Sequence, residues 1–391
     1  MSARRTEIEN SCFFGRQPGT DTRIHGTGEG IHGCSKAKRL NNVYKNAKEE
    51  LQVMKKMMSV IACSAMLVAF AGVAFAADIS VNLAQYQTGG EFPCYRIAEY
   101  FKKRVAELTD GRIEIKHFPG DLLGDWETQQ IHVKEGSLDM CFSPSSTSFD
   151  PETEFIWLPY FVHSWEGAKN LYQKGGEGEK LLSEICRRNN THCVGVSPQG
   201  FSVVVSNKKF TPMPGDETLK KVKTRVMPAK LEQITGESFG FMTLSMPWGE
   251  IHSALMLGTI DAAMGADFSE VVLFKDVVKY QYNYNYAFSA APWIINLDLW
   301  NSLSTEDQEI FEKALSEAID LEWERAVEAQ EDSIATMEEA GVEVIELTDE
   351  QVAANMKVTR EKAWSWAAEN MYSKEFMEKV RKMAEPLPTE Q

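Results

Sequence analysis

Apolar and polar positions alternate along short segments of this chain, and stretches with helical spacing separate them. Ile79–Leu83 and Arg112–Phe118 place apolar side chains at every second position, which is the period of a strand. Between them, Pro93–Leu108 repeats its apolar residues at the spacing of a helix that buries one face. A helix over Thr128–Lys134 and a strand over Leu138–Phe142 follow. This order predicts an α/β fold with a parallel sheet.

The longest run with helical spacing lies in the C-terminal third of the chain. Apolar side chains recur at about every 3.6 residues over positions 305–340, with Ser304 as a suitable N-cap and Gly341 as a suitable end. At 1.5 Å per residue this helix would be roughly 54 Å long, which is typical of a coiled coil or a strut. Val342–Ile345 predicts a last strand, and Thr348–Met383 is mostly helical.

The middle of the chain alternates between the same two periods. Trp165–Cys186 has helical spacing that is interrupted by Gly175 and Gly176. Cys193–Ser197 and Gly200–Val205 are predicted as two strands. Tyr280–Ala287, in which four tyrosines alternate with other residues, is predicted as a further strand.

Leu219–Phe268 arranges a strand, a helix and a second strand around one arginine. The alternation over Val222–Val226 places Arg225 on the face opposite the two valines. Helical spacing follows over Glu250–Leu257, and Thr259–Ala263 predicts a short buried strand. By spacing alone, Arg225 is interpreted as part of a solvated basic run, because lysines occupy positions 220, 221 and 223.

The N-terminal part differs from the rest in composition. Residues 1–53 are polar, basic and without a sustained period, which indicates a non-native or disordered extension. Residues 54–76 begin with Met54-Lys55-Lys56, continue as an apolar run and end in Ala-Phe-Ala. This is the pattern of a cleaved secretory signal peptide, so we expect a periplasmic protein.

Charge and cysteine content limit the function further. Residues 77–391 hold 30 basic and 51 acidic side chains, a net charge of -21, which disfavours binding to nucleic acid. The cysteines of this part are Cys94, Cys141, Cys186 and Cys193. Cys186 and Cys193 flank a predicted helix-to-strand turn, and two interpretations stay open: a local disulfide, or two buried thiols. No spacing of cysteine and histidine suggests zinc.

Motifs of common enzymes are absent from the sequence. There is no GxGxxG, Walker A, GxSxG, HExxH or HRD pattern. The five histidines after residue 76 do not lie at a recognisable spacing from a nucleophile. A periplasmic enzyme acting on a small organic acid stays open as an alternative, as does a ligand-sensing adaptor for a receptor.

Several segments together resemble the solute-binding proteins of TRAP (tripartite ATP-independent periplasmic) transporters, of the DctP type. The resemblance rests on the K-x-R strand with its G-E-I-x-x-A-L-x-x-G-x-I-D-A continuation, on G-R-I-E-I-K-x-F-P-G and D-L-L-G, on Trp157-Leu158-Pro159-Tyr160-Phe161, and on N-x-x-x-W-x-x-L. It extends over nearly the whole chain after residue 76. It implies a two-lobe periplasmic binding protein fold with crossing strands, a long domain-spanning helix and a ligand-facing loop after the first strand.

The resemblance also implies where the lobes divide. Lobe I would contain residues 77–201 plus about 288–320. Lobe II would contain residues 202–287 plus about 321–391, together with the spanning helix.

The implied function is to bind an organic acid between the lobes and deliver it to the membrane permease subunits, without enzymatic activity. Arg225 would clamp the carboxylate and support no core. Further ligand-binding residues implied by family position are Phe201, Trp248, Met264, Asp267 and Trp293. Ser145 joins them because it follows the carboxyl end of a predicted strand, where ligands lie in α/β sheets.

The ligand class is predicted only broadly. The aromatic candidates would suit an aromatic or other bulky monocarboxylate, and a 2-oxo acid or small dicarboxylate is the alternative. Met264 and Gly265 follow I-D-A-A, where the resemblance implies an acidic metal ligand in a branch that binds 2-oxo acids. A thioether binds hard cations poorly, so we expect neither metal nor cofactor.

If Met54 is the true start, the exported protein should begin near Ala77. Mass spectrometry of the protein from its native periplasm should therefore find an N-terminal peptide close to this residue. Any peptide from residues 1–53 would contradict this interpretation.

Overall fold

The computed structural model describes residues 52, 54–58, 77–87, 89–90, 92–142, 144 and 146–386. The chain divides into two compact units, Met1–Ala74 and Phe75–Gln391. In the first unit, the described residues are helical and exposed. The predicted extension and signal peptide otherwise lie outside the described residues. Within the described part of the chain, no helix is both long and apolar enough to span a membrane.

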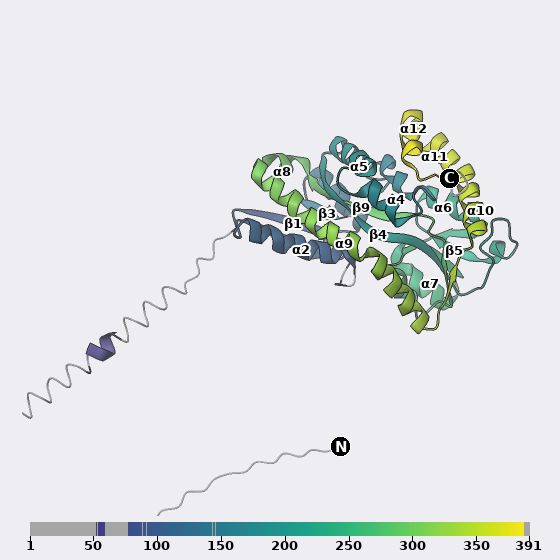
Figure 1. Ribbon diagram of the computed structural model, residues 1–391, viewed down its shortest axis with the longest axis horizontal. Helices are drawn as coiled ribbons and strands as arrows, with labels where there is room; N and C mark the ends of the chain where they lie inside the picture. The colour runs from purple at the N-terminus through teal and green to yellow at the C-terminus, as the bar shows by residue number, and fades with distance from the viewer. Residues whose placement is uncertain are drawn as a thin grey trace, which may run out of the picture. The chain divides into compact units, whose positions relative to one another are not determined.

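The second unit is built on ten strands (Figure 1). In chain order they are β1 Ile79–Gln85, β2 Ile113–Pro119, β3 Met140–Phe142, β4 Thr191–Ser206, β5 Lys223–Val226, β6 Met242–Ser245, β7 Ala262–Asp267, β8 Tyr280–Asn283, β9 Phe288–Asn296 and β10 Glu343–Glu346. Their order in the sheet is β2-β1-β3-β9-β4-β7-β5-β6, while β8 pairs with both β4 and β10. β1 runs parallel to β2 and β3, which confirms the predicted β-α-β start.

Helices surround these strands. The α-helices are α2 Pro93–Leu108, α3 Trp126–Glu135, α4 Trp165–Tyr172, α5 Glu177–Arg188, α6 Lys230–Phe239, α7 Ile251–Leu257, α8 Leu297–Ser302, α9 Thr305–Glu339, α10 Asp349–Thr359, α11 Ser365–Asn370 and α12 Lys374–Met383. Short 3-10 turns are η1 Pro151–Trp157, η2 Leu219–Lys221, η3 Trp248–Glu250 and η4 Val271–Phe274, and a π turn, η5, covers Arg360–Trp364. The predicted mixed α/β class is confirmed.

The strand β4 belongs to both halves of the sheet. Its first part pairs with β9 up to Phe201, and its second part pairs with β7 from Ser202 onward. The sequence predicts two strands here, whereas the structure has one 16-residue strand. A register shift between Pro198 and Gly200 absorbs the proline, which has no N–H to donate, and Gly200 adopts a φ of +148° that a side chain would disfavour.

The predicted strand over Tyr280–Ala287 is wrong in its second half. β8 ends at Asn283, and β9 begins only at Phe288. Asn285 has a φ of +48°, a left-handed conformation that asparagine tolerates better than most residues and that a strand cannot contain. The side chains of Tyr284 and Tyr286 are buried in the core that they share with Phe239 and Met264.

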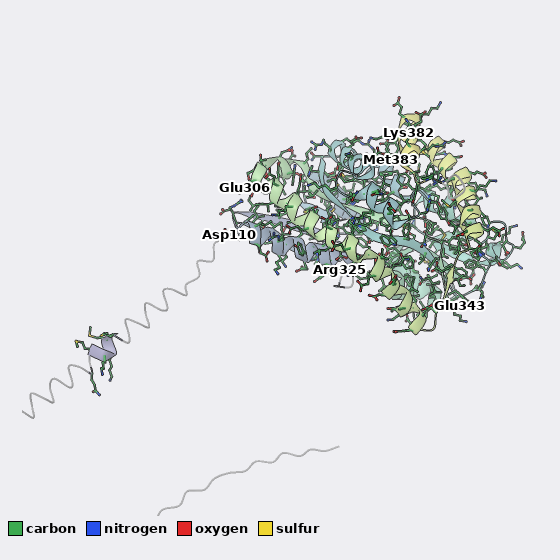
Figure 2. All side chains as sticks on the ribbon, viewed as in Figure 1. Asp110, Glu306, Arg325, Glu343, Lys382 and Met383 are labelled. Carbon is green, nitrogen blue, oxygen red and sulfur yellow. The ribbon has the colours of Figure 1, made fainter. Side chains whose placement is uncertain are left out.

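The 35-residue helix α9 confirms the long helix predicted from the sequence. Ser304 caps it by accepting a hydrogen bond from the N–H of Asp307 at 3.1 Å. Figure 1 shows α9 running from α8 past β4 toward α7, and Figure 2 labels Glu306 near its start, Arg325 along it and Glu343 just after it. The helix therefore spans the strands of both halves.

Ion pairs hold the first part of α9 against α2 and the turn before β2. Arg96 contacts Glu322 at 2.6 Å, Arg104 contacts Glu317 at 2.7 Å, and Arg112 pairs with Asp307. The carboxylates of Glu322 and Asp307 are nearly buried, where an ion pair is screened less than at the surface. These contacts add to the packing of Phe101 on Phe311.

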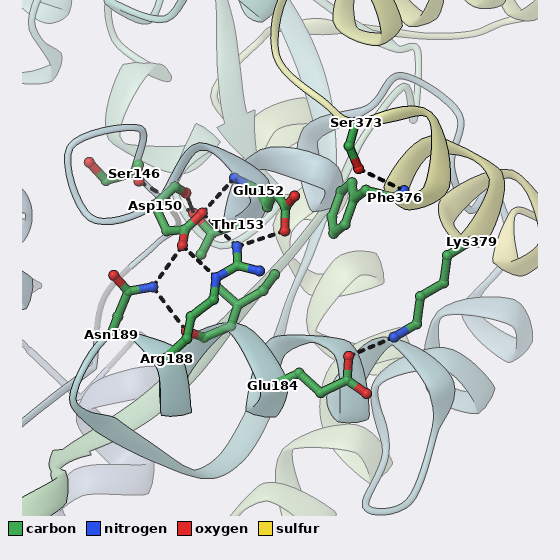
Figure 3. A network of polar contacts seen from close by, with 11 residues as sticks. Ser146, Asp150, Glu152, Thr153, Glu184, Arg188, Asn189, Ser373, Phe376 and Lys379 are labelled. Atoms are coloured by element: carbon green, nitrogen blue, oxygen red, sulfur yellow. Dashed lines mark hydrogen bonds and ion pairs between the residues drawn. The ribbon is translucent and has the colours of Figure 1, made fainter.

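Two further polar contacts position α5 (Figure 3). At its end, Arg188 donates from Nε and Nη2 to the two carboxylate oxygens of Asp150, both at 2.9 Å, and it pairs with Glu152 of η1 at 2.6 Å. Along its length, Glu184 pairs with Lys379 of α12 at 2.7 Å. The C-terminal helices are thereby connected to the first half of the sheet.

Gly236 lies where α6 packs on the second half of the sheet. A Cβ at this position would come within 2.8 Å of Thr243 Cγ2 and 3.2 Å of both Met264 Sδ and Val226 Cγ1. Although alanine has the higher helix propensity, Gly236→Ala should lower the free energy of unfolding by about 1–3 kcal/mol because the site is overpacked. Urea unfolding measures this. Gly249→Ala is the control, since its Cβ meets nothing within 4 Å; equal stability of both variants would contradict the prediction.

Candidate functional site

Arg225 lies in β5, and two backbone carbonyls hold its guanidinium. Nε donates to the carbonyl of Met246 at 2.9 Å, and Nη1 donates to the carbonyl of Met264 at 3.0 Å. Nη2 donates no hydrogen bond within the described part of the chain. The guanidinium is thus fixed in orientation, while one of its nitrogens stays available for a ligand.

The burial of Arg225 decides between the two interpretations of the basic segment. Its side chain is 1 % exposed, whereas Lys220 and Lys221 beside it are exposed. The interpretation of Arg225 as part of a solvated basic run is therefore wrong. So is the expectation that it supports no core, because its hydrogen bonds connect β5 to β7 and to the residue after β6.

Glu232 of α6 and Tyr286 form a polar layer behind this arginine. The Tyr286 hydroxyl donates to Glu232 Oε1 at 2.6 Å. Burial raises the pKa of Glu232, while the hydrogen bond from Tyr286 and the charge of Arg225 oppose this shift. Burial likewise lowers the pKa of Arg225, against the opposing charge of Glu232. The two charges therefore stabilise each other in a desolvated environment.

Trp248 and Met264 flank the guanidinium in different ways. The centre of the guanidinium lies 5.7 Å from the centroid of the Trp248 ring, within the range of a cation–π contact. Trp248 packs in turn on Phe274 with ring centroids 5.5 Å apart. Met264 acts through its carbonyl, since its side chain is fully buried in the core. The predicted neighbourhood of Arg225, Trp248 and Met264 is present in the structure.

A second polar group joins the loop after β1 to the turn after β7. Gln87 Nε2 donates to Glu270 Oε1 at 2.8 Å, and the Tyr86 hydroxyl lies 3.4 Å from the same oxygen. The Tyr86 hydroxyl also lies 3.5 Å from Gln199 Oε1 on β4. This group, Tyr86, Gln87, Gln199 and Glu270, brings together residues from both halves of the sheet.

Asp267 stands next to Glu270 and completes a pair of buried carboxyl groups. Asp267 is 2 % exposed and accepts hydrogen bonds from the N–H and the hydroxyl of Ser269, at 2.9 and 2.6 Å. Burial raises the pKa of Asp267. Burial together with the negative charge of Asp267 raises the pKa of Glu270 to about 8, and Arg225 opposes this shift. Arg225 therefore interacts electrostatically with Glu270.

Two other predicted site residues, Phe201 and Trp293, pack among other aromatic side chains. Phe201 packs among aromatic side chains, with its ring centroid 5.4 Å from Trp165 and 5.0 Å from Phe288. Trp293 is fully buried, packs 4.9 Å from Phe142 and donates to the Ser197 hydroxyl at 3.0 Å. Ser145 lies outside the described residues. For all three, a role in ligand binding stays a prediction.

The sequence analysis did not single out Glu232, Glu270, Gln87 or Tyr86. Tyr86 and Gln87 belong to the loop expected to face the ligand, so their position was an available signal. Glu270 lies three residues after a buried strand. This position alone indicates a ligand-binding residue only weakly when the fold is unknown. Glu232 carries no signal, since it is one acid among several polar residues of its helix.

Thiols and metal ligands add no further site. Cys94, Cys141, Cys186 and Cys193 are free and buried, so Cys186 and Cys193 form no disulfide in this structure. Among the residues that the structure describes, no group of three or more histidine, cysteine, aspartate or glutamate side chains is arranged to hold a metal ion.

Residues 85–370 match the family model of bacterial extracellular solute-binding proteins, family 7, known as DctP. A solute-binding protein of Verminephrobacter eiseniae is 26% identical over 287 residues, which cover 72% of this chain and 82% of that protein. The ectoine-binding periplasmic protein TeaA of Halomonas elongata is 25% identical, over 66% of this chain and 76% of TeaA. The C4-dicarboxylate-binding periplasmic protein DctP of Rhodobacter capsulatus is also 25% identical, over 66% and 77%.

Solved structures show the same fold. A TRAP periplasmic solute-binding protein of Desulfovibrio salexigens with bound orotic acid superposes with a TM-score of 0.70 at 22% identity, covering 78% of this chain and 98% of that one. One from Haemophilus influenzae with bound L-gulonate also gives 0.70 at 22% identity, covering 78% and 99%. The two-lobe fold is therefore confirmed. By its match over residues 85–370 and by its fold, the chain belongs to the solute-binding proteins of TRAP transporters, bacterial extracellular family 7.

Proposed function

We propose that this protein binds an organic acid with Arg225 and delivers it to the membrane permease subunits of a TRAP transporter. One observation carries the proposal: the guanidinium is nearly buried and oriented by two carbonyls, yet Nη2 makes no hydrogen bond within the described part of the chain. A ligand carboxylate would accept a hydrogen bond from Nη2 and would place a negative charge next to the desolvated guanidinium.

The relatives support an acid as ligand. DctP of Rhodobacter capsulatus is named for C4-dicarboxylates, and YiaO of Escherichia coli for 2,3-diketo-L-gulonate. Solved relatives hold D-erythronate, L-gulonate and succinate. Each of these ligands carries a carboxylate, which is the group that a fixed guanidinium recognises best.

The ligand would lie between the lobes, and the change of partner along β4 is where we propose the division. Residues 77–201 and about 288–320 would form lobe I, and residues 202–287 and about 321–391 lobe II. β4 pairs with β9 up to Phe201 and with β7 from Ser202, so a hinge at this point bends the strand without breaking its pairing on either side. Closure then removes water from around Arg225 and strengthens its hydrogen bonds.

Other predicted residues have supporting roles in this proposal. Trp248 would cover the ligand beside the guanidinium, and Asp267 would contact its polar groups. Phe201, Trp293 and Ser145 would line the remaining wall, while Met264 holds Arg225 through its carbonyl. The protein would act in the periplasm, without metal or cofactor, and would return its ligand chemically unchanged.

Arg225→Lys tests the clamp. The substitution keeps the charge but loses the fork that bonds Met246, Met264 and a carboxylate together. We expect the affinity for acids that raise the melting temperature of the native protein to fall by roughly tenfold to more than a hundredfold. Isothermal titration calorimetry measures this, at a temperature below the melting point of the variant, because the loss of two buried hydrogen bonds also lowers stability.

Lys221→Ala is the matched control, since Lys221 is an exposed cation near the same strand. It should leave the affinity unchanged. Equal affinity of the native protein and a folded Arg225→Lys variant would remove Arg225 from the site, and with it the main reason for expecting an acid.

A further inference from the structure

We propose that the ligand carries a cationic nitrogen in addition to its carboxylate, so that it is an amino acid or amidinium acid, and that Glu270 and Asp267 bind this nitrogen. The inference rests on the proposed function, because the carboxyl pair acts in the same site as Arg225. The proposed function assigns only the carboxylate of the ligand, to Arg225. This inference assigns a second ligand group, the nitrogen.

The first observation is the incomplete hydrogen bonding of Glu270. Glu270 is 8 % exposed. The amide of Gln87 and the hydroxyl of Tyr86 both donate to its Oε1. Within the described part of the chain Oε2 accepts no hydrogen bond, and no basic nitrogen lies within 4.0 Å of either oxygen. Since Oε2 is not one of the fully buried atoms without a partner, a ligand nitrogen can reach it.

The second observation is the balance of buried charge. Three carboxyl groups, those of Glu232, Asp267 and Glu270, are at most 8 % exposed around one buried base, Arg225. Glu232 is the main counter-charge of Arg225. No basic side chain is among the main influences on Asp267, and Arg225 is the weakest of those on Glu270. When Asp267 and Glu270 are ionised, a purely anionic ligand would add to this negative charge, whereas a ligand nitrogen would offset it.

The third observation is a buried donor without an acceptor at the end of β1, just before the loop that contains Gln87. Gln85 is fully buried, and its Oε1 accepts from the N–H of Gln87 at 2.9 Å and from Cys94 at 3.1 Å. Its Nε2 has no hydrogen-bond partner among the residues that the structure describes. Cys94 also contacts Gln87 at 2.6 Å, and Gln87 contacts Glu270. The unsatisfied amide is a hydrogen-bond donor, so a ligand oxygen would complete it, while a ligand nitrogen would pair with the carboxyl groups.

A nitrogen-free acid would need a different protonation state of the same pair. Glu270 would then have to be protonated and donate to a ligand oxygen. The two cases give opposite pH dependence, because the pKa of Glu270 is raised to about 8 by burial and by Asp267. The other groups facing it are Tyr86 and Cys94, whose pKa values are raised well above their usual range, and Arg225, which stays charged.

The sign follows from the free protein. Below pH 8 most Glu270 side chains carry a proton, which a cationic ligand must displace. The affinity for such a ligand should therefore rise by about tenfold from pH 6.5 to pH 8. The affinity for a nitrogen-free acid should not rise over the same range, because it uses the protonated form.

The experiment uses matched pairs of carboxylates on the mature full-length protein. Phenylalanine is compared with 3-phenylpropanoate and proline with cyclopentanecarboxylate, and ectoine represents an amidinium acid. Thermal shift selects the members that bind, and calorimetry at pH 6.5 and pH 8 measures them. At pH 8 we expect each nitrogen-bearing acid to bind at least tenfold more tightly than its nitrogen-free partner. Glu270→Gln, which keeps the shape and the acceptor for Gln87, should abolish this preference, while Glu339→Gln at the exposed end of α9 should retain it.

The outcomes separate this inference from the proposed function. If nitrogen-free acids bind as tightly as their partners, and Glu270→Gln leaves the ratio unchanged, the inference is wrong. Arg225→Lys would then still weaken both members of each pair, and the proposed function would stand. A library in which no member raises the melting temperature contradicts both.

Discussion

The burial of one guanidinium is the constraint on which the second half of this protein depends. A charged group that leaves water must be compensated, and here the compensation comes from several elements at once. β7 and the segment after β6 supply carbonyls to Arg225, and α6 supplies the carboxylate of Glu232. Gly265 has to stay without a side chain, because a Cβ would lie 3.2 Å from Nη1. The positions of a helix and two connections are thus fixed by a single cation.

If Arg225 binds the ligand as proposed, recognition and folding are not separable here. A donor that only touched ligand would be flexible in the free protein and would lose entropy on binding. Arg225 has already lost that freedom, since two of its donors are used in the fold. Its remaining donor is preorganised, and the cost of ordering it was met during folding.

The sequence predicted the elements that follow a clear period. The helix over Pro93–Leu108 agrees with α2 at both ends, and the long helix differs from α9 by one residue. Prediction failed where local geometry overrides a period, as at Asn285, whose left-handed backbone ends a strand that the tyrosine alternation would continue. The burial of Arg225 was not readable from spacing, because neighbouring lysines give the pattern of an exposed run. Glu270 was missed for a related reason: its partners Tyr86 and Gln87 are more than 180 residues away in sequence, and only the fold brings them together.

The continuity of β4 has a mechanical meaning. Two lobes joined only by flexible loops could adopt many relative orientations, whereas a strand that both lobes share resists twisting and limits these orientations. The register shift between Pro198 and Gly200 lies just before the proposed hinge at Phe201 and Ser202, and it already departs from regular pairing. If the two lobes move as proposed, this strand restricts their relative motion, because β9 and β7 hold its two parts. The open and closed forms would then differ by a bend of β4 instead of by independent rearrangements of separate segments.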